Sequence, residues 1–192
     1  MLIFVVIIIL LITIFTNGNP IEKAKFRKEI KNYLSETYSN MNWRINSIDY
    51  SFKEGDFSAT VLSDKGITFL VYENNFRKLD DNYVSSVWMN EIKTATTKKA
   101  EEIVGSKAEV IVDIFINGKG IIENNNNIPS YSNVEEKVAS STTLSVTAAF
   151  SESKSYSQIM DIISWIKENK YYAETYFDSK MGIYPLEYHL AN

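Results

Sequence analysis

Hydrophobic residues are distributed in two different ways along this chain. Met1 to Phe15 is continuously apolar, with Thr13 as its one hydroxyl side chain and no charged side chain. After this segment, apolar positions recur among polar ones at the spacings of amphipathic helices and strands. The pattern therefore predicts a segment that enters lipid, followed by a folded polar region.

The apolar segment is short for a membrane span. Leu2 to Phe15 extends roughly 21 Å as a helix, at about 1.5 Å per residue, whereas a bilayer core is about 30 Å thick. An apolar run of about 7–15 residues is typical of a signal peptide. We therefore predict a membrane anchor or signal segment over residues 1–16, which contacts the lipid bilayer through residues 1–15.

The side of the membrane is set by the flanking charges. No Lys or Arg precedes the apolar segment, and the first basic residues, Lys23, Lys25, Arg27 and Lys28, follow it. The positive-inside rule, taken literally, would keep the domain in the cytoplasm. We expect a single N-terminal anchor in the cell membrane with an extracellular domain. Secretion after cleavage near residues 16–18, a cytoplasmic domain and a native start further upstream stay open.

The polar region begins with a helix followed by strands. Asn19 can cap the helix, and Pro20 suits its first position. Apolar residues within it share one face, and short glycine-containing turns separate the strands that follow. The expected elements of a first domain at 19–122 are a helix to about Tyr38, strands at 43–53, 57–62 and 67–73, a helix from about 83 to Gly105, and a strand at 108–116.

A smaller lobe is expected after an asparagine-rich loop at 123–132. Residues 133–192 have the pattern of a β-α-β-β lobe, whose helix would open with a capping box at Ser155 to Gln158. Ile121-Ile122 could also complete a short hairpin. The predicted fold class is α+β, with an N-terminal helix packed on an antiparallel meander and then this smaller lobe.

Charge and composition exclude several functions. The 192 residues carry a net charge of −4, the charged residues are interspersed, and there is no cysteine. A nucleic-acid binder would show a basic patch or stripe, so we predict no nucleic-acid partner. Disulfides, zinc-thiolate sites and cysteine nucleophiles are impossible without cysteine. No motif predicts a cofactor or a metal.

No arrangement of residues predicts catalysis. His189 is the single histidine, and nothing in the spacing supplies the partners that a catalytic histidine needs. Neighbouring carboxylates such as Asp80-Asp81 do not share a helix face, and Asp80, Asp81 or Asn82 is better explained as a helix cap. We predict that the protein is not an enzyme, although two dispersed carboxylates could still form a hydrolase site.

Two surfaces are candidates for binding. The outer face of the first helix is basic, which favours either solvent or anionic lipid head groups beside the membrane segment; its residues are Lys23, Lys25, Arg27, Lys28 and Lys31. Tyrosines crowd the C-terminal strands, where they could pair across strands or form a partner or glycan surface. These are Tyr171, Tyr172, Tyr176, Tyr184 and Tyr188.

One stretch resembles a known family. Asn19 to Glu73 reads NPIEKAKFRKEIKNYLSETYSNMNWRINSIDYSFKEGDFSATVLSDKGITFLVYE. Together with the apolar leader and a second lobe near Thr143 to Tyr188, it resembles the YfjL-like family of small membrane-anchored or exported proteins of low-GC Gram-positive bacteria. The resemblance implies no established activity, so no functional residue follows from it. The helix-then-meander order is also similar to cystatin-like and PepSY-like domains.

The expected function is therefore binding rather than catalysis. We expect a membrane-anchored or exported interaction protein of the bacterial cell envelope, with another envelope protein or a wall component as its partner. The alternatives are a protease-inhibitor-like regulatory module and an envelope hydrolase with dispersed carboxylates.

Overall fold

The computed structural model describes residues 4, 16–122, 127–134, 138, 141–151, 153–171, 173–179 and 186–188. The chain forms two compact units, which divide between Tyr83 and Val84. Each unit contains one four-stranded sheet. The predicted α+β class is confirmed.

The first unit is a helix followed by an antiparallel meander. The Asn19 side-chain oxygen accepts a hydrogen bond from the backbone N–H of Ile21 at 2.9 Å, so the predicted cap is confirmed. The sheet order β1-β2-β3-β4 follows the sequence, because short turns join consecutive strands. The elements are α2 (Pro20–Thr37), β1 (Trp43–Ser51), β2 (Asp56–Ser63), β3 (Thr68–Glu73) and β4 (Leu79–Asp81).

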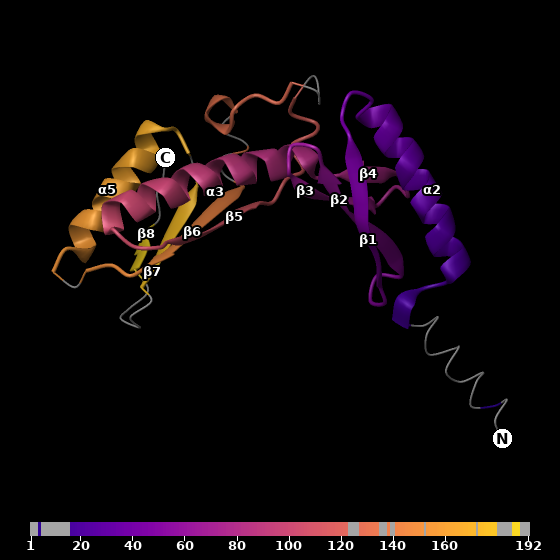
Figure 1. Ribbon diagram of the computed structural model, residues 1–192, viewed down its shortest axis with the longest axis horizontal. Helices are drawn as coiled ribbons and strands as arrows, with labels where there is room; N and C mark the ends of the chain where they lie inside the picture. Colours follow the sequence, from indigo (N-terminus) through magenta and orange to yellow (C-terminus); the bar gives the residue numbers. More distant parts are fainter. Residues whose placement is uncertain are drawn as a thin grey trace. The chain divides into compact units, whose positions relative to one another are not determined.

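Helix α2 lies along one face of this sheet (Figure 1). Every second residue of β2 is buried, which places Phe57, Ala59 and Val61 on the inner face. The buried side of α2 consists of Phe26, Ile30 and Leu34, and the ring of Phe26 packs against that of Phe57.

The second unit contains a mixed sheet of order β5-β6-β7-β8. Strands β6 and β7 are parallel, and a parallel pair needs a crossover connection, which α5 supplies. The other pairs in this sheet are antiparallel. The elements are α3 (Tyr83–Val104), β5 (Glu109–Ile114), the 3-10 helix η1 (Tyr131–Asn133), β6 (Thr142–Ala148), α5 (Ser155–Glu168), β7 (Glu174–Ser179) and β8 (Leu186–Tyr188).

Aliphatic side chains dominate the core of the second unit. Helices α3 and α5 cover one face of the sheet (Figure 1). The four isoleucines of α5 at helical spacing are buried there. Trp88 of α3 is fully buried, and its indole N–H donates to the carbonyl of Pro129 at 2.9 Å.

The units divide at a different place from the expected domain boundary. The predicted first domain, 19–122, included the helix and the strand that are now α3 and β5. Strand β5 instead pairs with β6, from Glu109 opposite Thr147 to Ile114 opposite Thr142. The second unit is therefore larger than the expected lobe at 133–192, because its sheet is completed by a strand from before the asparagine-rich loop.

Part of the segment expected as a flexible loop at 123–132 is held in place. Glu91 of α3 accepts hydrogen bonds from the Ser130 hydroxyl and from the backbone N–H of Tyr131. The ring of Tyr131 is buried against Trp88. Residues 123–126 lie outside the described residues.

Three local expectations differ from the structure. Ile121-Ile122 form no strand, since residues 119–121 make a turn. The strand expected at 43–53 ends at Ser51, and the side chain of Phe52 is 56% exposed because a turn follows. Ser155 is not a cap: α5 begins at this residue, and the predicted capping-box partner Gln158 accepts from the backbone N–H of Ser151 instead.

Among the residues that the structure describes, no helix is both long and apolar enough to cross a membrane. Residues 1–15, which carry the predicted membrane segment, lie outside that described part except for Phe4.

Candidate functional site

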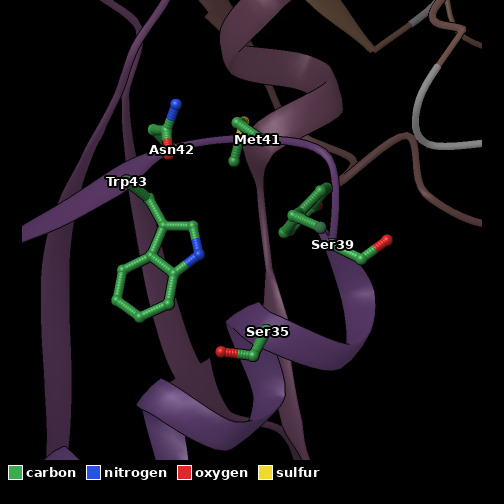
Figure 2. A pocket seen from close by; sticks show the side chains of 6 residues that line it. Ser35, Ser39, Met41, Asn42 and Trp43 are labelled. Carbon is green, nitrogen blue, oxygen red and sulfur yellow. The ribbon is translucent and has the colours of Figure 1, made fainter.

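An open groove lies where α2 ends and the chain turns into β1. Its volume is about 380 Å³. Figure 2 shows the indole of Trp43 and the side chain of Ser35 on facing sides of this space. The lining residues are Ser35, Tyr38, Ser39, Met41, Asn42 and Trp43.

Hydrogen bonds at both ends hold the loop that shapes the groove. The backbone N–H of Tyr38 donates to the carbonyl of Leu34 and closes the helix, and the N–H of Met41 donates to the carbonyl of Tyr38. Further along, the N–H of Asn42 donates to a carboxylate oxygen of Asp64 at 3.1 Å, and the N–H of Asp64 donates to the carbonyl of Asn42. The loop between α2 and β1 is thus fastened to the β2–β3 turn.

The groove offers polar but uncharged groups. Ser35, Ser39 and Asn42 are exposed, and Trp43 is partly buried. Hydroxyl and amide groups beside an indole ring can bind a neutral polar group by hydrogen bonds and ring stacking. None of the six lining side chains is a carboxylate, a histidine or a lysine. The groove therefore offers uncharged hydrogen-bonding groups and an aromatic ring.

A buried carboxylate lies behind the groove. Asp81, at the end of β4, is fully buried, and it is the one buried carboxylate among the described residues. It accepts from the hydroxyls of Tyr33 and Tyr38, at 2.5 and 2.7 Å, and from the backbone N–H of Tyr83 at 2.9 Å. Since Tyr38 also lines the groove, this carboxylate supports the wall of the groove.

The three donors explain how a charge is tolerated in the core. A buried carboxylate is very unfavourable unless hydrogen bonds replace its water, and charge-assisted hydrogen bonds of this kind are short and strong. Asp81 connects the last turns of α2 to the start of α3 at Tyr83. The predicted capping by one of Asp80, Asp81 or Asn82 is thus confirmed for Asp81.

Burial and the carboxylate both act on the two tyrosines. Burial raises the pKa of Tyr33 and of Tyr38 far above the ordinary tyrosine value, and the negative charge and hydrogen bonds of Asp81 raise both further. Both hydroxyls therefore stay protonated and keep donating to the carboxylate. This arrangement stabilises the fold.

Two of the five predicted surface tyrosines can be placed by their side chains. Tyr171 is buried, and its ring packs against Tyr131 and Trp165, so it belongs to the core. Tyr176 is partly buried in β7. The backbone of Tyr188 lies in β8. Tyr172 and Tyr184 lie outside the described residues, and the partner surface as a whole stays a prediction.

The basic face of α2 projects into solvent. Lys25, Arg27, Lys28 and Lys31 are exposed, and Lys23 is partly buried. Lys25 lies 3.6 Å from a carboxylate oxygen of Glu29 one turn along the helix. The contact of this face with lipid head groups stays a prediction.

Sequence reasoning missed the residues that make this site. Asp81 was expected as a possible cap, but nothing in the sequence linked it to Tyr33, 48 residues earlier. The exposed serines carry no sequence signal of their own. Among the described positions, no three His, Asp or Glu side chains lie close enough together to hold a metal ion; His189 lies outside these positions.

One family match covers both the groove and the buried carboxylate. Residues 1–88 match the model of the YfjL-like N-terminal domain. This stretch covers the apolar segment, the whole first unit and the start of α3. No curated protein and no solved structure matches the chain.

Proposed function

We propose that this protein, whose residues 1–88 match the model of the YfjL-like N-terminal domain, is a non-enzymatic binding protein of the bacterial cell envelope. In this proposal, residues 1–15 hold the chain at the membrane, and the folded units lie on the outer side. There they bind another envelope protein or a wall component.

The extent of the family match carries the proposal. The match runs over both the apolar segment and the first folded unit. Four residues, 16–19, separate that segment from the first residue of α2. The unit would therefore work within a short distance of the lipid surface.

The side chains near the membrane segment fit such a position. Lys25, Lys28 and Lys31 recur at every third position of α2 and are exposed. Basic residues beside a membrane are attracted to anionic head groups, by about 1 kcal/mol each. This attraction would add to the apolar segment in keeping α2 close to lipid.

The groove supports binding as the activity of the first unit. Its neutral hydroxyl and amide groups and the Trp43 ring can recognise a polar partner. The carboxylate behind it is occupied by three donors, which gives the groove a rigid wall.

A topology reporter tests the location. A phosphatase fused after Asn192 should be active in intact cells, and a fluorescent protein that matures only in the cytoplasm should be dark at the same position. The opposite pair of results would contradict the outer location.

Crosslinking tests the binding function. A photo-crosslinking amino acid placed at Ser35 in intact cells should capture one defined partner, whereas the same group at Lys65, an exposed turn residue, should not. Absence of any specific product from Ser35 and from several other exposed positions of both units would count against a binding function.

Lipid contact of α2 can be tested separately. The full chain is reconstituted in nanodiscs with or without phosphatidylglycerol, and hydrogen exchange of α2 is followed. Anionic lipid should slow exchange in α2, and the triple substitution Lys25→Glu, Lys28→Glu and Lys31→Glu should remove the effect. The matched variant Lys53→Glu, Lys65→Glu and Lys78→Glu changes exposed lysines elsewhere in the first unit; an equal effect of both variants would contradict a specific contact.

A further inference from the structure

The second unit carries the net charge of the protein. Residues 1–83 contain ten Lys and Arg and ten Asp and Glu, whereas residues 84–192 contain ten and fourteen. The excess of negative charge is not spread evenly over the second unit, because one face of its sheet collects carboxylates.

The two faces of this sheet differ completely. Val110, Val112 and Ile114 of β5 are buried under the helices, and the residues between them are exposed. The same alternation runs through β6 and β7. Because side chains alternate between faces along a strand, nine positions of β5, β6 and β7 form the outer face. We call this set the outer sheet face: Glu109, Ile111, Asp113, Thr143, Ser145, Thr147, Glu174, Tyr176 and Asp178.

Strand register arranges the outer sheet face in three rows. Within β5, β6 and β7 the central row is Ile111, Ser145 and Tyr176, which carry no charge, and the register continues this row to Glu187 of β8. The row on one side has Glu109 and Asp178 at its ends, with Thr147 between them.

The row on the other side repeats this arrangement. Asp113 and Glu174 are its ends, with Thr143 between them. The four carboxylates thus mark the corners of a rectangle of about 10 by 13 Å, from the usual strand spacing and rise. None of the nine residues is Lys or Arg.

The central row adds an apolar contact. Ile111 is 52% exposed, and Tyr176 is partly buried. Phe115, the next residue of the same alternation beyond β5, is 72% exposed. A charged rim around an apolar centre is the usual composition of a protein interface, in which the rim selects the partner and the centre excludes water.

We propose that the outer sheet face binds a positively charged, extended segment of another protein. Charge complementarity requires Lys or Arg opposite the corner carboxylates, with an apolar residue opposite the central row. An extended chain in which every second side chain faces the sheet meets this requirement with the pattern basic-x-apolar-x-basic, because residues i and i+4 of a strand are about 13 Å apart. This inference specifies the partner of the proposed binding function and rests on it.

The test uses the full chain in nanodiscs and a defined fluorescent peptide. The peptide contains Lys-Thr-Leu-Thr-Lys twice, and binding is measured by fluorescence anisotropy. It should bind at least tenfold more tightly than the matched peptide with Glu in place of Lys. Replacing its Leu by Ser should weaken binding severalfold. Equal affinity for the Lys and Glu peptides would overturn the proposal.

Variants locate the binding surface. The pair Glu109→Gln and Asp178→Asn, and the pair Asp113→Asn and Glu174→Gln, should each weaken binding about tenfold. The control pair, Asp161→Asn and Glu168→Gln, removes two exposed carboxylates from α5 and should leave the affinity unchanged. Equal losses in the control and test pairs would overturn the proposal.

The salt dependence of peptide affinity is measured on the wild-type protein, so that misfolding of a variant cannot affect the result. Affinity should fall severalfold between 50 and 300 mM NaCl, because salt screens exposed charge pairs. An affinity independent of salt would overturn the inference. Failure of the peptide test together with specific crosslinking at Ser35 would reject the partner chemistry alone, whereas an inactive external reporter would reject the proposed location.

Discussion

The two units combine the same parts in different ways. Each has a four-stranded sheet with helix packed on one face. The first sheet is built from neighbours in sequence, whereas the second pairs β5 with β6 across a connection from Ile114 to Thr142 and closes around a parallel crossover. The first unit is thus assembled from local contacts, and the second depends on contacts distant in sequence.

The cores differ as well. The first contains a charged group, Asp81, satisfied by two tyrosines and a backbone N–H. The second is fastened by Trp88 and Glu91 of α3, which bind the segment Pro129 to Tyr131. A buried polar cluster specifies one arrangement strictly, because every unsatisfied donor or acceptor is unfavourable, whereas an aliphatic core depends on volume.

Removing the largest buried side chain should have the greatest effect. Trp88→Ala should destabilise the second unit by about 4 kcal/mol, since it removes a fully buried ring and the bond to Pro129. The free energy of unfolding of this unit is measured by hydrogen exchange of β5 and β6. Trp165→Ala, at a partly buried indole, is the matched control and should have a smaller effect. Equal losses would contradict the central position of Trp88.

Removing the buried carboxylate should destabilise the first unit by about 3 kcal/mol. Asp81→Ala leaves the buried hydroxyl of Tyr38 and that of Tyr33 without their acceptor. Asp81→Asn keeps an oxygen acceptor and should lose about 1 kcal/mol. The free energy of unfolding of both variants is measured by denaturant titration, with hydrogen exchange of β2 as the probe. Asp49→Asn, at an exposed strand position, is the control. A full-sized loss in Asp81→Asn would show that charge, rather than hydrogen bonding, dominates.

Glycines with the same φ should differ in how much a substitution by alanine destabilises the fold, because their surroundings are packed differently. Gly18 and Gly55 both have φ of +74°, but a Cβ at Gly18 would lie 2.5 Å from the ring of Phe57, whereas nothing lies within 4 Å of one at Gly55. Gly55→Ala should cost about 1 kcal/mol from backbone strain, and Gly18→Ala about 2 kcal/mol more from overpacking.

The second unit offers the same contrast. A Cβ at Gly118 would lie 2.6 Å from the ring of Trp88. Gly105 has a similar φ, but no atom lies within 4 Å of a Cβ placed there. Thermal unfolding of the four single variants tests both pairs. Equal shifts within a pair would show that packing around the glycine relaxes freely.

Alkaline pH should distinguish the two units by their tyrosines. Burial raises the pKa of Tyr131 in the second unit from 10.0 to about 12, while Tyr33 and Tyr38 are raised further. A raised pKa in the folded state means that the stabilisation is complete below about pH 10 and declines as the pH rises above it. Absorbance at 295 nm, compared between the wild type and Tyr33→Phe or Tyr131→Phe, measures each titration. Ionisation of Tyr33 in the folded protein below pH 12 would contradict its burial beside Asp81.

Local pattern was enough to predict the elements. Asn19 and Pro20 determine the start of α2, because a side-chain acceptor and a preset φ satisfy the helix end without help from the rest of the fold. Alternation in β2 likewise identifies Phe57, Ala59 and Val61 as buried, since a strand has only two faces. Turn residues predicted the order of the first sheet.

Tertiary structure alone decided which elements belong together. Alternation in β5 shows that Glu109, Ile111 and Asp113 share a face, but not that β6 and β7 bring Asp178 and Glu174 into the same rows. Similarly, Asp81 could be recognised as a helix cap, whereas its bonds to Tyr33 and Tyr38 depend on the packing of α2 against the sheet. Sequence determines local conformation through short-range sterics and hydrogen bonds; strand pairing and polar clusters depend on distant segments that only the folded chain brings together.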